Sequence, residues 1–63
     1  MEYYVQGLGF HTGFLSIQGE TRVWGSTRQL FDDDEICELI KSIPKYIAYR
    51  VLTINHNVVH INA

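Results

Sequence analysis

The sequence contains little of what usually stabilises a small protein. Its only cysteine is Cys37, so no disulfide can form within the chain. No apolar run is long enough to span a membrane, and no basic start is followed by an apolar stretch, as in a signal peptide. We therefore expect a cytoplasmic protein with a reduced cysteine, located in the host cytoplasm if the source is a virus.

Charge of either sign is also scarce. The net charge is −2, and the five basic residues are scattered along the chain: Arg22, Arg28, Lys41, Lys45 and Arg50. Binding to a phosphate backbone draws on several Lys and Arg contacts at once, so nucleic acid is not the expected partner. The seven acids are also few for a mimic of DNA charge.

The length of 63 residues predicts a single domain over residues 1–63, and the initial Met1 indicates a complete small reading frame. A chain of this size buries only about 60% of the surface that its unfolded form exposes, so its stability is marginal. Such scaffolds usually add a disulfide, a metal or a second subunit. Because no disulfide can form, the remaining sources of extra stability are a metal, association with another chain or unusually good packing.

The stretch FDDDEICELI, residues 31–40, places four acids before an apolar stripe and raises the question of a carboxylate site. Asp32 can cap a helix by accepting the N–H of Glu35, whose side chain can reach back to the N–H of the cap. Phe31 and Ile36 can form a hydrophobic staple around this start. The other two acids meet the positive end of the helix dipole. We interpret the stretch as a helix start rather than a metal or acid–base site.

The apolar residues that follow have helical spacing. They recur at i, i+3, i+4 and i+7, as Ile36, Leu39, Ile40 and Ile43. Pro44 disfavours a helical conformation at the residue before it. The pattern predicts a helix over residues 32–43.

The C-terminal segments YIAYRVLTI and NVVHINA are typical of strands and predict a hairpin over residues 46–62. We place a two-residue turn at residues 56–57. This register sets two apolar pairs opposite each other, Ile54 with Val59 and Leu52 with Ile61. An alternative register that sets Arg50 against Ile61 is a worse match.

The N-terminal half predicts two more turns. In FHTGF, a three-residue loop with Gly13 in the left-handed position would set Phe10 opposite Phe14, and Leu8 opposite Ser16. A type II′ turn at Gly19-Glu20 would set Ile17 opposite Arg22, and Leu15 opposite Trp24. A strand over residues 21–25 follows this second turn.

The expected fold is therefore α+β: an antiparallel sheet of about five strands in the order βββαββ, with one α-helix packed on one face. Glycines at positions 7 and 9 would lower the sheet surface, so that the helix or a large side chain such as Trp24 can lie close.

One short helix covers one face of such a sheet, whereas the strands are apolar on both faces. A contiguous apolar face marks a partner or self-association surface, and edge strands can extend a sheet across a dimer. The alternative is that the registers are wrong and these residues pack inside a more curved sheet. We expect a non-enzymatic protein-binding module, an inhibitor or accessory factor of the kind that viruses and mobile elements encode.

Aromatic and arginine side chains dominate binding hot spots. The candidate partner-binding residues are Phe10, Phe14, Trp24, Tyr49 and Arg50, with His11 and His56 at the turn tips as secondary candidates. The expected partners are another protein, whose identity the sequence does not give, and a second copy of the chain in a homodimer. No membrane partner is expected.

Two further functions stay open as alternatives. The first is a self-associating structural protein. The second is a single-stranded nucleic-acid binder that stacks bases on sheet aromatics. GLGF followed by FLSI resembles the glycine–aromatic strands of RNA-binding sheets, although basic residues do not surround it.

The sequence contains no pattern typical of catalysis or of a cofactor. No local motif places a serine, threonine or Cys37 beside a histidine. His56 and His60 have a spacing that could bind zinc on a helix, but their segment is predicted as turn and strand. We expect no enzyme activity, no metal and no cofactor.

Overall fold

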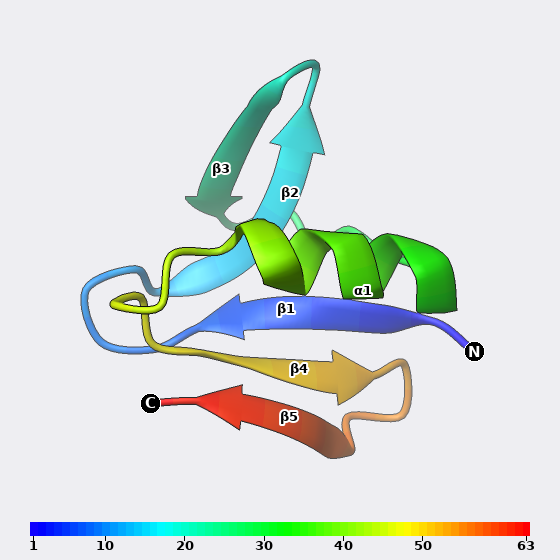
Figure 1. Ribbon diagram of the computed structural model, residues 1–63. Coiled ribbons are helices and arrows are strands. Elements are labelled where there is room, and N and C mark those ends of the chain that lie inside the picture. Colours follow the sequence, from blue (N-terminus) through cyan, green and yellow to red (C-terminus); the bar gives the residue numbers. More distant parts are fainter.

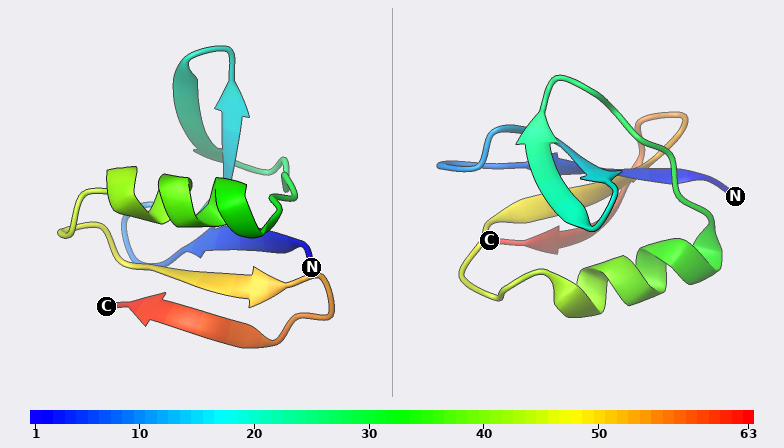
Figure 2. Two further views of the ribbon diagram at one scale, coloured as in Figure 1. Left: turned by 45° about the vertical axis from the view of Figure 1, so that its right-hand side comes forward. Right: turned by 90° about the horizontal axis from the view of Figure 1, so that it is seen from above.

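The computed structural model describes residues 1–63. The elements are β1 (Tyr3–Gly7), β2 (Gly13–Gln18), β3 (Thr21–Gly25), α1 (Asp33–Ser42), β4 (Tyr49–Thr53) and β5 (Val58–Asn62). The strands form one antiparallel sheet in the order β3-β2-β1-β4-β5, and α1 crosses one face of it (Figures 1 and 2). This confirms the predicted α+β fold.

The central strand β1 pairs along its full length with β4, but with β2 only at Gln6↔Phe14 and Gly7↔Gly13. Beyond these pairs β2 and β3 turn away from β1 as a hairpin (Figure 1). The segment before α1 takes the vacated place. Tyr3 N–H donates to Phe31 O and Phe31 N–H donates to Tyr3 O, both at 2.8 Å. The exposed edge of β1 is thereby closed.

The core lies between α1 and the sheet. Its nine buried residues are Val5, Leu15, Phe31, Ile36, Leu39, Ile43, Ile47, Tyr49 and Val51. They come from the helix, from β1, β2 and β4, and from the segments at both ends of the helix, so one apolar layer unites elements that are distant in sequence.

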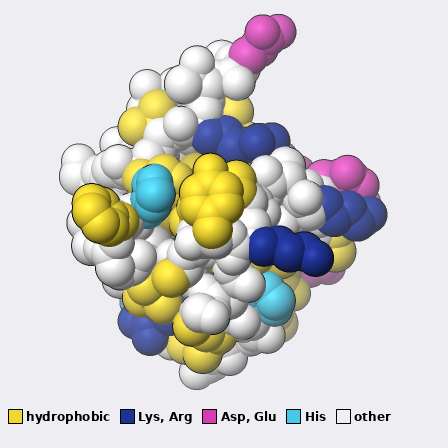
Figure 3. Space-filling model, turned by 60° about the vertical axis from the view of Figure 1, so that its left-hand side comes forward, with side chains coloured by type: hydrophobic (Ala, Val, Ile, Leu, Met, Phe, Trp, Pro, Cys, Tyr) yellow, Lys and Arg dark blue, Asp and Glu magenta, His cyan; other side chains and the backbone are white.

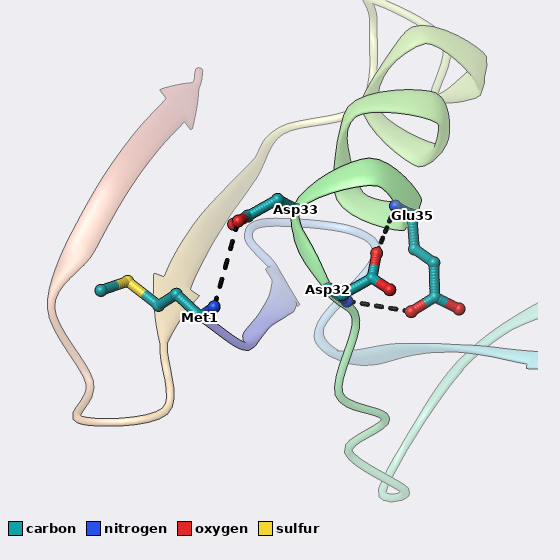
Figure 4. A network of polar contacts seen from close by, with 4 residues as sticks. All are labelled: Met1, Asp32, Asp33 and Glu35. Carbon is teal, nitrogen blue, oxygen red and sulfur yellow. Dashed lines mark hydrogen bonds and ion pairs between the residues drawn. The ribbon is translucent and has the colours of Figure 1, made fainter.

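The predicted helix start is confirmed. Glu35 N–H donates to Asp32 Oδ1 at 2.8 Å, and Asp32 N–H donates to Glu35 Oε1 at 2.9 Å (Figure 4). The amino group of Met1 lies 4.0 Å from Asp33 Oδ2. The helix ends before Ile43, which is extended at φ −77° and ψ 124° ahead of the proline.

The predicted β2–β3 hairpin is also confirmed. Leu15 lies opposite Trp24 and Ile17 opposite Arg22. Gly19 adopts φ +66°, whereas Glu20 has no positive φ, as the predicted type II′ turn requires.

The predicted β1–β2 register is wrong. Gln6, not Phe10, lies opposite Phe14, and the connection is a five-residue loop over residues 8–12. Gly13 has the positive φ expected of it, +104°, but Gly9 is left-handed as well, at +67°. Two left-handed glycines allow a longer loop than the three-residue turn that we predicted.

The two glycines of GLG differ in their roles. A Cβ on Gly7 would collide with the carbonyl oxygen of His11 and lie 3.0 Å from Cε3 of Trp24, so Gly7 allows the close approach predicted for Trp24. A Cβ on Gly9 would meet nothing within 4 Å. Gly9 serves the turn and not the packing, which corrects that part of the prediction.

The predicted β4–β5 register is wrong too. Ile61 lies opposite Arg50 and Val58 opposite Leu52, with an irregularity between Val51 and Leu52, and β4 begins at Tyr49 rather than at residue 46. The rejected pairing is therefore the observed one. It is acceptable because the Arg50 Nε–H donates to Gln6 Oε1 at 2.7 Å and is not left without a polar partner beside Ile61.

The turn explains this register. Thr53 closes it, since Thr53 O accepts His56 N–H at 2.8 Å and Thr53 N–H donates to Asn57 O at 2.9 Å. Thr53 Oγ1 also accepts Asn57 N–H at 3.2 Å. His56 adopts φ +68°, the only positive φ outside glycine. The turn therefore begins earlier than a two-residue turn at residues 56–57 would.

Candidate partner-binding surfaces

Part of the sheet face opposite α1 is covered by the chain itself. On this face Tyr4 is buried, with the Phe14 ring edge-on at 5.6 Å and the Arg28 guanidinium carbon 4.8 Å from the Tyr4 ring centroid. The Tyr4 hydroxyl and His56 Nδ1 are 2.8 Å apart and hydrogen-bonded. The predicted open apolar face is therefore closed around Tyr4.

The first group of predicted contact residues lies at the β1–β2 loop. Phe10 is fully exposed there, with a relative accessibility of 103%. His11 lies against Trp24, with ring centroids 6.0 Å apart, and Trp24 packs against the core. Figure 3 shows hydrophobic side chains and a histidine side by side on one face, with basic side chains among the other patches.

Two predicted contact residues belong to β4. Tyr49 is only 4% exposed and forms part of the core, so it presents little of its side chain at the surface. Burial raises its pKa above the ordinary value, and its hydroxyl lies 3.4 Å from His60 Nε2. Arg50 is half-buried and engaged with Gln6.

The predicted aromatic residues do not form one platform. Phe14 packs with Tyr4 on the face opposite α1, whereas Trp24 and Tyr49 pack with the core on the helix side. Phe10 projects from a loop. Base stacking along the sheet therefore has no continuous aromatic surface here.

Sequence reasoning predicted the strand β5 but named none of its residues as a contact candidate. Val58 lies opposite Leu52 and Ile61 opposite Arg50, and cross-strand partners share a face. Val59 is two residues from Ile61 and shares its face too. The irregularity thus gathers three apolar side chains on the face opposite α1, with exposures of 42% for Val58, 54% for Val59 and 58% for Ile61. We call these three residues and the outer edge of β5 the β5 surface.

The β5 surface combines two features that favour a partner. β5 is the last strand of the sheet, and residues 58–62 contain no Asp, Glu, Lys, Arg or proline. Natural edge strands are usually shielded by charge, by proline or by a covering segment. The run VVHINA was the available signal, but our predicted register had paired Val59 and Ile61 with apolar residues of the preceding strand.

The acidic stretch and the reactive side chains form no centre. No three His, Cys, Asp or Glu side chains are grouped so that they could hold a metal ion. Cys37 is exposed on α1. A hydrogen bond with Asp33, together with desolvation and the negative charge nearby, raises the pKa of Tyr3. The acids at residues 32–35 act as a helix start.

A cavity of about 300 Å³ lies between the end of α1 and the end of β5. It is lined by Ile40, Lys41, Ile43, Lys45, Tyr49 and Asn62. Its size is at the lower bound of ligand pockets. None of the six is an acid or a histidine.

No helix of the protein is both long and apolar enough to cross a membrane. Comparisons of the chain with protein-family models, with curated proteins and with solved structures found no match.

Proposed function

We propose that this protein is a non-enzymatic binding module that takes up an extended segment of another protein along β5. The observation that carries the proposal is the β5 surface, an uncharged edge strand with three exposed apolar side chains on one face. A segment added beside such a strand gains main-chain hydrogen bonds, and apolar side chains next to it supply contact area.

The arrangement of the sheet supports this choice of strand. β5 pairs with β4 on one side only, and α1 packs mainly over the centre of the sheet (Figure 2). The outer edge of β5 therefore has neither a neighbouring strand nor the helix to cover it. The segment after β3 gives β1 such cover at Phe31, whereas β5 pairs with β4 alone.

The class of protein that we propose is an inhibitor or accessory factor, because such a protein needs only one binding surface on a small folded scaffold. A second copy of the chain is the alternative occupant, and it would make the protein a homodimer through the same strand. Light scattering across a hundredfold concentration range separates these occupants. A dimer assigns the β5 surface to self-association, and a monomer leaves it for a different protein.

The test uses one matched pair of variants. Val59→Lys introduces a charge on the β5 surface, and Ile17→Lys introduces the same charge at an apolar residue of β2 that is 41% exposed. We expect Val59→Lys to abolish capture of partners from a lysate of the source cells, or dimerisation if that is observed, and Ile17→Lys to leave it intact. Equal capture by wild type and Val59→Lys, with both folded by circular dichroism, contradicts the proposal.

A further inference from the structure

We propose that the cavity between α1 and β5 accepts an apolar side chain from an acidic extended segment, with carboxylates of that segment facing Lys41 and Lys45. This inference rests on the proposed function, since it assigns the chemistry of the segment that adds to β5. It concerns the helix side of the strand, whereas the β5 surface lies on the opposite side.

The cavity has an apolar floor and a fixed wall. Ile40, Ile43 and Tyr49 line it with apolar surface, and Ile43 and Tyr49 are buried in the core. The side-chain amide of Asn62 donates to Ile47 O at 2.7 Å and to Lys45 O at 3.2 Å. These hydrogen bonds connect the segment after α1 to the end of β5, so the two walls of the cavity are fixed relative to each other.

The position of the cavity fits an added strand. Tyr49 and Asn62 are cross-strand partners, and both line the cavity, so it opens over the C-terminal end of β5 on the helix side. Side chains of a strand alternate between the two faces of the sheet. A segment lying beside residue 62 can therefore direct one side chain into the cavity and its neighbours to the opposite face.

The charge around the cavity selects the segment. Lys41 and Lys45 are two of only five basic residues in the chain, and no acid lines the cavity. The ion pair of Lys41 with Glu38, 3.7 Å long, is exposed on both sides and weak. The acids at residues 32–35 lie at the opposite end of α1. The corner is locally positive in a chain of net charge −2, and it complements an acidic segment.

The test selects random eight-residue peptides by phage display on the wild-type protein and measures affinities of the enriched peptides by fluorescence anisotropy. We expect enriched sequences to place Asp or Glu close to one large apolar residue. The double change Lys41→Ala and Lys45→Ala is expected to weaken binding about fivefold, as for two exposed ion pairs. Added salt should reduce wild-type affinity toward that of the variant. Arg22→Ala, an exposed basic residue on β3, is the matched control and should bind as wild type does.

Two contrary results are distinguishable. Peptides that lose binding with Val59→Lys but show no acidic preference, and no effect of the two lysine changes, overturn the inference and leave strand addition along β5 intact. Peptides that bind regardless of Val59→Lys, or a selection that enriches no binding peptide, overturn both the proposed function and this inference.

Discussion

The two hairpins at opposite ends of the sheet have similar lengths but different construction. β2 and β3 pair without interruption from Phe14↔Gly25 to Gln18↔Thr21, around a glycine turn. β4 and β5 pair with an irregularity, around a turn that holds His56 in the left-handed region. The first hairpin is regular because its turn fixes the register. The second is shaped by side-chain bonds from Thr53 and Tyr4.

The outer strands of the two hairpins, β3 and β5, also differ in the side chains that they expose. β3 exposes Thr21 and the charged Arg22, and its neighbour β2 is closed on the far side where Gln29 Oε1 accepts Ile17 N–H at 2.7 Å. β5 exposes three uncharged apolar side chains and has no covering segment. Edge strands that are not shielded pair with other chains. The comparison shows that both ends of the sheet share a hairpin architecture, whereas the outer strand with three exposed apolar side chains and no charged residue lies at one end only.

The largest expected effect is a difference in stability between alanine substitutions in the two hairpins. Leu15 is buried in the core, so Leu15→Ala should lower the free energy of unfolding by about 2–5 kcal/mol. Ile61 on β5 is exposed, so Ile61→Ala should change it by no more than about 0.5 kcal/mol. Urea denaturation at a fixed low protein concentration measures both.

A large cost for Ile61→Ala would mean that the β5 surface is buried in solution. Repeating the denaturation at higher protein concentration then shows what covers it. A midpoint that rises with concentration identifies a second copy of the chain.

A smaller effect separates the two turns. Gly19→Ala places a Cβ at φ +66° and should destabilise the protein by about 1–2 kcal/mol. His56→Gly relieves the same kind of strain but loses the hydrogen bond to Tyr4, which offsets about 1 kcal/mol. Its net effect should be close to zero in the same urea assay. A loss as large as that of Gly19→Ala would show that the Tyr4 contact, and not the turn, determines this region.

Local signals explain what could be predicted. The capping box of Asp32 and Glu35, the proline after Ile43 and the glycine of the Gly19-Glu20 turn each act within a few residues. Their effects are therefore readable from the sequence without knowledge of the tertiary structure. Strand alternation also accounts for the observed sides: Leu15 and Val51 belong to the core, whereas their neighbours Phe14 and Leu52 do not.

The register of the β4–β5 hairpin depended on distant contacts. Thr53 closes the β4–β5 turn and Tyr4 holds His56, although Tyr4 is 52 residues away in the sequence. The pairing of Arg50 with Ile61 becomes acceptable only when Gln6 is beside it on β1. The β5 surface followed from this register, so it was hidden from the sequence, and hot-spot statistics pointed instead to the buried Tyr49.

The smallest expected effect is a pH dependence that distinguishes the two hairpins, because the second contains Tyr49 and residues 13–25 contain no tyrosine. Burial raises the pKa of Tyr49 above 10.0 in the folded protein, so the unfolded chain releases this proton first. The stability that Tyr49 contributes is complete below about pH 10 and is lost as the pH rises through the raised pKa of the folded state. In urea denaturation from pH 8 upward, Tyr49→Phe should therefore lose less stability at alkaline pH than wild type.

Tyr46→Phe is the control, because Tyr46 lies three residues away and is exposed, and it should follow the wild-type profile. Identical profiles for Tyr49→Phe and wild type would show that the Tyr49 hydroxyl reaches water, and the apolar floor of the cavity beside β5 would then be wetter than the packing of Ile43 and Tyr49 indicates.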